Sequence, residues 1–60
     1  GLMRGDVAAM QQALMSKGYD TGGADGLAGY KTRRSIGQWQ ATQGRAPTCF
    51  PEAGMKSALR

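Results

Sequence analysis

Residues 19–35 read YDTGGADGLAGYKTRRS, and this stretch decides the fold because it separates two segments with a helical pattern. Four of the eight residues from 22 to 29 are glycine. Glycine adopts positive φ at little steric cost, and an Asp-Gly pair such as Asp25-Gly26 is typical of a turn. A hairpin would need alternating strands on both sides of this pair, and neither side alternates. We therefore expect a loop over 18–29 that joins two helices.

Apolar residues ahead of the loop recur every three or four positions, which is the period of an amphipathic helix. They predict a first helix over about 6–17, with Asp6 as its N-cap and Gly18 just beyond its end. After the loop, the same kind of pattern predicts a second helix over about 30–42.

A connector over 43–50 follows, and a short third helix is predicted over about 51–59 with Pro51 at its first position. The whole chain, 1–60, then forms one domain of the all-α class, a compact three-helix bundle with a glycine-rich loop between helices 1 and 2. The side chains expected in its core are Val7, Met10, Leu14, Tyr19, Leu27, Ile36, Trp39, Gln40, Met55 and Leu59.

The composition argues against an enzyme. A chain of 60 residues leaves little room for a deep active site, because a domain of this size buries only about 60% of its unfolded surface. The chain lacks histidine and has four carboxylates, whereas most acid–base and metal chemistry draws on His, Asp, Glu and Cys. We expect no catalytic residue, no metal site and no cofactor. Cys49 is the single cysteine, so no internal disulfide can form.

The net charge of +4 favours anionic partners, which include nucleic acid, acidic glycans or peptides, and membrane surfaces. No apolar run approaches the ~20 residues that a membrane span needs. Because the chain begins with Gly1 rather than Met, we interpret it as a module of a longer protein, with any targeting segment outside it.

Two known functions of glycine-rich loops do not fit. A phosphate-binding P-loop needs Gly-Lys-Ser/Thr after a buried strand, but Tyr30 separates Gly29 from Lys31, and a helix precedes the loop. A calcium-binding EF-hand loop needs several oxygen ligands, and only Asp25 is acidic among the ligand positions. A structural turn, a DNA-binding module and a family-specific binding loop remain open.

Certain residues stand in a recognisable order and spacing along the chain: Met10-Gln11, Leu14, Gly18-Tyr19, Asp25-Gly26, Gly29, Thr32, Trp39-Gln40, Gly44 and Leu59. This series resembles the peptidoglycan-binding domain 1 family, whose pattern is Leu-Gln…Leu…Gly-Tyr, then Asp-Gly-x-x-Gly-x-x-Thr, then aromatic-Gln, Gly and a closing Leu. The chain departs from the pattern at several positions. Met10 stands where Leu is usual, Ala28 where an aromatic residue is common and Tyr30 where proline is common. Cys49-Phe50 replaces a glycine-containing turn.

The resemblance extends from about residue 4 to residue 59 and implies a compact three-helix domain appended to bacterial cell-wall enzymes, such as lytic transglycosylases, amidases and carboxypeptidases. It also implies that the domain is not catalytic and holds its enzyme on peptidoglycan, in the periplasm or at the cell wall. The residues after Thr32 suggest a lytic murein transglycosylase in particular. The implied partners are peptidoglycan, through its glycan strand or stem peptide, and an attached catalytic domain, whereas nucleic acid is not expected.

Residues 25–34 offer what a peptidoglycan binder needs. Tyr30 supplies an amphipathic ring, the start of the second helix favours carboxylates, and arginine pairs with carboxylates in bidentate geometry. The residues expected to bind ligand are Asp25, Gly26, Gly29, Tyr30, Lys31, Thr32, Arg33 and Arg34.

Structural readings of the same residues stay open. Asp25 can be a turn residue whose carboxylate accepts backbone N–H groups, Thr32 can pack against the loop, and the cations can form a solvated helix face. Gln11 and Gln40 would then fasten helices to loops. Two other classes of function also stay open. One is a small helix-turn-helix nucleic-acid-binding domain, although such a turn has only about 3–4 residues. The other is a plain protein-docking module.

Overall fold

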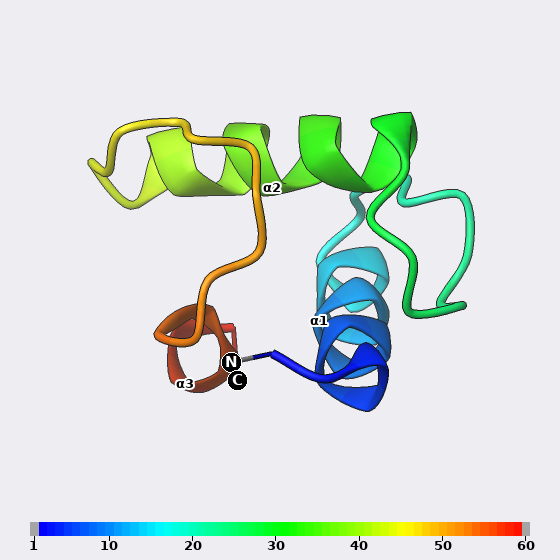
Figure 1. Cartoon of the computed structure of the whole chain (residues 1–60). Helices are drawn as coiled ribbons and strands as arrows, with labels where there is room; N and C mark the ends of the chain where they lie inside the picture. Colours follow the sequence, from blue (N-terminus) through cyan, green and yellow to red (C-terminus); the bar gives the residue numbers. More distant parts are fainter. Residues whose placement is uncertain (1, 60) are drawn as a thin grey trace.

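A computed structural model describes residues 2–59, and these form three α-helices (Figure 1). The helices are α1 (Arg4–Ser16), α2 (Tyr30–Thr42) and α3 (Met55–Ala58). In Figure 1, α2 lies across the top of the view, with α1 and α3 below it on opposite sides. The described part of the chain contains no strand, so the predicted all-α, three-helix class is confirmed.

Helix α1 begins two residues earlier than the sequence predicted, and its N-cap is Met3. The prediction that Asp6 is the N-cap is wrong. Asp6 is instead the third residue of the helix, and its Oδ2 accepts the backbone N–H of Met3 at 3.0 Å. An acidic side chain at this position accepts the N-cap N–H and is stabilised by the positive end of the helix dipole. Asp6 therefore stabilises the start of the helix from within its first turn.

Glycine ends α1 as the sequence predicted, although the helix itself stops at Ser16. Gly18 has a φ of +94°, and its N–H donates to the carbonyl of Met15 at 3.0 Å. The next N–H, that of Tyr19, donates to the carbonyl of Leu14 at 3.0 Å. These two bonds satisfy carbonyls that the helix end would leave unpaired, and the left-handed residue between them favours glycine.

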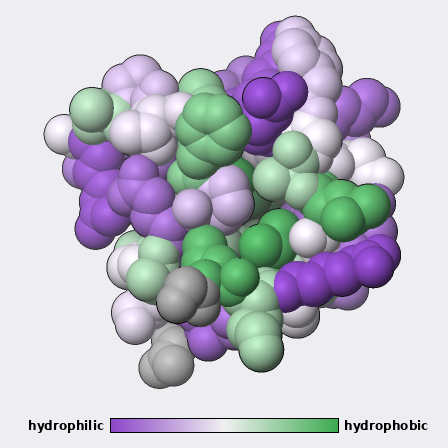
Figure 2. Space-filling view, viewed as in Figure 1, coloured by the Kyte–Doolittle hydropathy of each residue, from purple (hydrophilic) through white to green (hydrophobic). Residues whose placement is uncertain are grey.

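One apolar cluster joins the three helices. Its members are Met10, Leu14, Ile36, Trp39, Met55 and Leu59, with Leu2, Ala13 and Tyr19 partly buried against them. Val7 and Gln40 are also buried. Figure 2 shows apolar side chains gathered in the middle of this face, between α1 and α3 and below α2, with hydrophilic residues at its flanks.

Leu27 does not belong to this core, and the prediction that placed it there is wrong. Its side chain is 57% exposed. The Leu27 backbone is held on both sides, because its N–H donates to Asp25 Oδ1 at 2.9 Å and its carbonyl accepts from Gln11 Nε2 at 3.0 Å. Polar groups therefore occupy the space under the loop, and the leucine side chain points away from it.

Helix α3 is shorter than predicted, because residues 51–54 form the turn that leads into it rather than its first part. The Met55 N–H donates to the carbonyl of Glu52 at 3.0 Å in that turn. Gly54 disfavours a longer helix, since glycine is a poor helix former. The segment is held by the buried side chains of Met55 and Leu59, and by a 2.7 Å ion pair between Lys56 and Asp6.

The anchoring role of Met55 leads to a stability prediction. Met55 is fully buried, whereas Met3 is 71% exposed. We expect Met55→Ala to lower the free energy of unfolding by about 2–5 kcal/mol, because the substitution leaves a cavity in the core. The same change at Met3 should alter it by less than about 0.5 kcal/mol. Denaturant titration followed by far-UV circular dichroism measures both, and equal effects would contradict the packing of α3.

Candidate functional site

The buried amide of Gln11 holds the loop between α1 and α2. Its Nε2 donates to Thr32 Oγ1 at 2.8 Å and to the Leu27 carbonyl at 3.0 Å, while its Oε1 accepts the Gly26 N–H at 2.8 Å. Asp25 Oδ1 lies 3.4 Å from the same Nε2. One side chain of α1 thus contacts both the loop and the first turn of α2. We call this group of five residues the elbow.

Gly26 is required in the elbow for two reasons. Its φ is +81°, a region that residues with a Cβ rarely adopt. In addition, a Cβ at this position would lie only 2.6 Å from the backbone oxygen of Arg4. The Arg4 side chain also contacts the loop, since its Nε donates to the Asp25 carbonyl at 2.8 Å. The Asp-Gly pair therefore packs directly against the start of α1.

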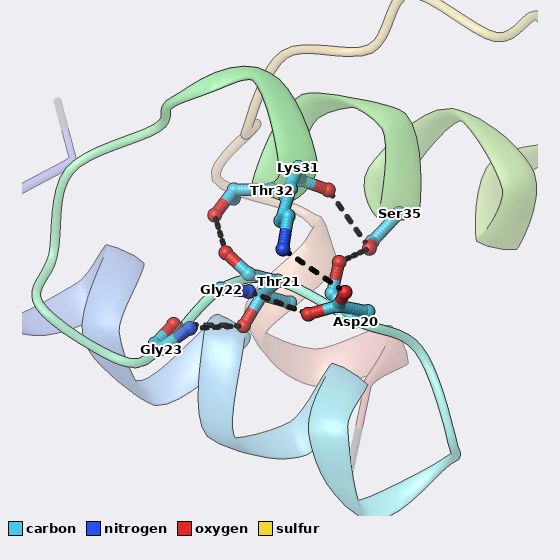
Figure 3. Close-up of polar contacts among 7 residues, drawn as sticks. All are labelled: Asp20, Thr21, Gly22, Gly23, Lys31, Thr32 and Ser35. Atoms are coloured by element: carbon cyan, nitrogen blue, oxygen red, sulfur yellow. Dashed lines mark hydrogen bonds and ion pairs between the residues drawn. The ribbon is translucent and has the colours of Figure 1, made fainter.

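The first half of the loop is fastened to α2 by two hydroxyl groups (Figure 3). Thr32 Oγ1 donates to the Thr21 carbonyl at 3.0 Å, and Ser35 Oγ donates to the Asp20 carbonyl at 2.8 Å. Figure 3 also shows Lys31 pointing at the Asp20 carboxylate, where the Nζ–Oδ2 distance is 3.4 Å. Residues 20–21 therefore run along the first two turns of α2 and fix its orientation.

Backbone N–H groups lower the pKa of the two loop carboxylates. The N–H of Leu27 holds the pKa of Asp25 below its ordinary value, and the Gln11 amide adds to this. The N–H of Gly22 lowers the pKa of Asp20 in the same way, followed by the ammonium of Lys31. Aspartate is ionised at neutral pH even at its ordinary pKa, and the lowered pKa keeps these two side chains as acceptors of the loop N–H groups into more acidic solution.

The structure divides the residues that were expected to bind ligand into two groups. Gly26 and Thr32 are buried, the Asp25 carboxylate is engaged by the loop, and Gly29 is the N-cap of α2. The other group lies on the surface of α2. It consists of Tyr30, which is 71% exposed, the exposed Lys31 and Arg34, and the half-buried Arg33.

Only part of this surface charge is already paired. Among residues 2–59 the ion pairs are Lys31 with Asp20 and Lys56 with Asp6. In the described chain, neither Arg33 nor Arg34 pairs with a carboxylate. These two guanidinium groups are therefore the cations of α2 that can meet an anionic ligand.

Two hollows, both open to solvent, share Tyr30 and Arg34 in their linings. One, of about 320 Å³, has a lining that is about equally polar and apolar, formed by Asp20, Tyr30, Lys31, Arg34, Ser35 and Gln38. The other, of about 460 Å³, is largely apolar and is lined by Tyr30, Arg33, Arg34, Cys49 and Phe50.

Phe50 and Cys49 line the apolar hollow, and the sequence analysis did not place either of them in the candidate site. Phe50 is the larger and more exposed of the two. Its side chain is 57% exposed, and the Arg33 guanidinium lies 5.7 Å from the centre of its ring. The only sequence signal was that Cys49-Phe50 departs from the turn expected at this point. This departure does not show which surface Phe50 faces. Its contact with Arg33 of α2 arises only when the chain folds.

Within residues 2–59, no group of three or more His, Cys, Asp or Glu side chains is arranged to hold a metal ion. None of the described helices has the length and apolar character needed to cross a membrane.

The family model for the peptidoglycan binding domain matches residues 3–51. The chain belongs to this family. The match includes α1, the elbow and α2, and it ends before α3. Membership supports a peptidoglycan-binding role, a place at the cell wall and the character of a binding module rather than an enzyme. Neither a comparison with curated proteins nor one with solved structures found a match.

The peptidoglycan-binding domain contains a neighbouring pair of glutamines that tests the elbow. Gln11 is buried at its centre, whereas Gln12 is exposed on the same helix. We expect Gln11→Ala to lower the free energy of unfolding by about 2 kcal/mol or more, because the buried Gly26 N–H loses its acceptor and Thr32 loses its donor.

Gln12→Ala makes the same chemical change without removing a buried contact, and it should change stability by less than about 0.5 kcal/mol. Both variants are measured by denaturant titration. If the two variants lost the same stability, the elbow would not hold the loop in place.

Proposed function

We propose that this peptidoglycan-binding domain is a non-catalytic anchor that keeps an attached murein-degrading enzyme, such as a lytic transglycosylase, on its polymeric substrate in the periplasm. The observation that carries the proposal is a cluster of four neighbouring residues on α2, namely Tyr30, Lys31, Arg33 and Arg34. We call this cluster the ledge. The elbow holds the helix that carries it.

The chemistry of the ledge suits peptidoglycan. The polymer presents sugar faces, amides and the free carboxylates of its stem peptides. Tyr30 offers an exposed ring with a hydroxyl group, and such amphipathic rings suit surfaces that are partly apolar and partly polar. Arg34 is exposed between the two hollows, where its guanidinium can pair with a carboxylate in bidentate geometry.

In this proposal the buried residues of the expected site support the ledge rather than contact the polymer. Gly26 and Thr32 lie inside the elbow, and Asp25 closes its turn. Gly29 begins α2. Substitution of these residues would reduce binding by moving or unfolding the ledge.

The geometry of residues 2–59 argues against a helix-turn-helix domain that binds nucleic acid. The segment between α1 and α2 covers residues 17–29, which is much longer than the 3–4-residue turn of a helix-turn-helix. The basic end of α2 is also tied to that segment through Lys31 and Ser35.

Retention on purified insoluble sacculi tests the proposal. The domain should co-sediment with sacculi at moderate salt, and Arg34→Ala should lower retention about threefold to tenfold, because a charge-assisted contact contributes about 1 kcal/mol at an exposed site. Arg45→Ala removes the same charge from an exposed position beyond the other end of α2. We expect this control variant to retain wild-type binding.

Failure of the wild-type domain to sediment with sacculi would contradict the proposed function. Equal losses for the two arginine variants would show that binding depends on net charge and not on the ledge.

A further inference from the structure

We propose that Phe50 forms, together with Tyr30, Arg33 and Arg34, a cleft that binds the carboxylate-bearing end of a peptidoglycan stem peptide. This inference rests on the proposed function and deepens it, because it names the part of the polymer that is recognised and adds a residue from outside α2. The cleft is the largely apolar hollow described above, open to solvent, with a volume of about 460 Å³. That volume suits a small ligand.

The lining of the cleft favours a carboxylate over a sugar. Arginine side chains are hydrogen-bond donors only, and Arg33 and Arg34 are the charged groups of the lining. A sugar face carries hydroxyl groups that need acceptors as well as donors, and the Tyr30 hydroxyl is the one oxygen acceptor among the side chains of this lining. A peptide terminus instead presents two acceptor oxygens beside a small apolar side chain. Its oxygens match the guanidinium groups, and its apolar part matches the rings of Tyr30 and Phe50.

One hydrogen-bond donor of Arg33 lacks an acceptor within residues 2–59. Its Nε is buried from solvent and has no hydrogen-bond partner among the described residues. Its guanidinium lies over the Phe50 ring, 5.7 Å from the ring centre. A buried donor without a partner is costly. Arg33 also lines the hollow, where a carboxylate can pair with its guanidinium. The Phe50 ring meanwhile limits the positions that the guanidinium can adopt.

The connector before α3 is built to hold Phe50 at this place. In Figure 1 the connector returns along α2 before it turns down to α3. The buried amide of Gln40 fixes it, since Nε2 donates to Thr48 Oγ1 at 3.0 Å and Oε1 accepts the Cys49 N–H at 3.0 Å. Thr48 Oγ1 also donates to Glu52 Oε1 at 2.9 Å. The ring of Phe50 therefore follows directly after two anchored residues.

The backbone at Cys49 is strained in a way that serves the same end. Its φ is +66°, the one positive φ among the non-glycine residues described. This conformation costs on the order of 1–2 kcal/mol, and such strain is found preferentially at functional sites. Gly37 makes room for the Cys49 side chain, because a Cβ at Gly37 would lie 2.5 Å from the cysteine sulfur. A strained residue, Cys49, and a helix glycine, Gly37, therefore lie next to the segment that places Phe50 against Arg33.

The test uses two small probes that differ only in the carboxylate. Acetyl-D-alanyl-D-alanine and its C-terminal amide are titrated into the isotopically labelled domain, and tri-N-acetylchitotriose serves as the sugar probe. We expect the acid to shift the NMR signals of the Arg33 and Arg34 side chains and of Phe50. The amide should bind at least fivefold more weakly, and the sugar should leave these signals unchanged. Shifts from the sugar but not from the acid would overturn the inference.

Variants separate the cleft from the wider proposal. Phe50→Ala should lower the affinity for the acid at least fivefold. Phe50→Leu keeps an apolar side chain without a ring and should also weaken binding, so it serves as the test if the alanine variant does not fold. Arg45→Ala should bind like the wild type. If the wild-type domain binds sacculi but Phe50→Leu binds the acid unchanged, the cleft is wrong and the proposed function stands. If the wild-type domain does not bind sacculi, the proposed function itself fails.

Discussion

The fold depends on the buried amide of Gln11, which contacts the loop and α2 at once. A chain of 60 residues has a small apolar core, so packing alone leaves a long glycine-rich loop with many possible conformations. The amide reduces this freedom because its donor and acceptor are both used, toward Thr32 on one side and Gly26 on the other. A buried polar network in which each member has a partner specifies one arrangement more strictly than apolar contact does.

Gln40 plays the same part for the second connection. It fixes the connector before α3 as Gln11 fixes the loop before α2. The two connections would otherwise be the least ordered parts of the chain, since they contain most of its glycine and both prolines. As a result, Phe50 from the second connection lines the same hollow as Tyr30, the first residue of α2, and the arginines of α2 complete it. The binding surface we propose is therefore a product of both glutamines.

Local pattern was sufficient for the helices and insufficient for the surface. The period of the apolar residues predicted α1 and α2 to within two residues, and Gly18 marked the end of α1. The sequence does not show whether Asp6 lies before the helix or within its first turn, because a carboxylate can satisfy backbone N–H groups from either position. Leu27 is apolar and is predicted in the core, but polar groups fill the space beneath it and its side chain is exposed. Phe50 could not be assigned to the cleft because its position follows from contacts far apart in sequence.

Amide hydrogen exchange at Gly26 tests the central role of Gln11 most directly. This N–H is buried and donates to Gln11 Oε1 at 2.8 Å, so it should exchange only when the elbow opens. We predict that its protection equals that of the slowest amides in the middle of α1 and that Gln11→Ala abolishes it, while Gln12→Ala leaves it unchanged. Exchange of the Gly26 amide as fast as that of an unprotected loop amide in the wild-type domain would contradict the account.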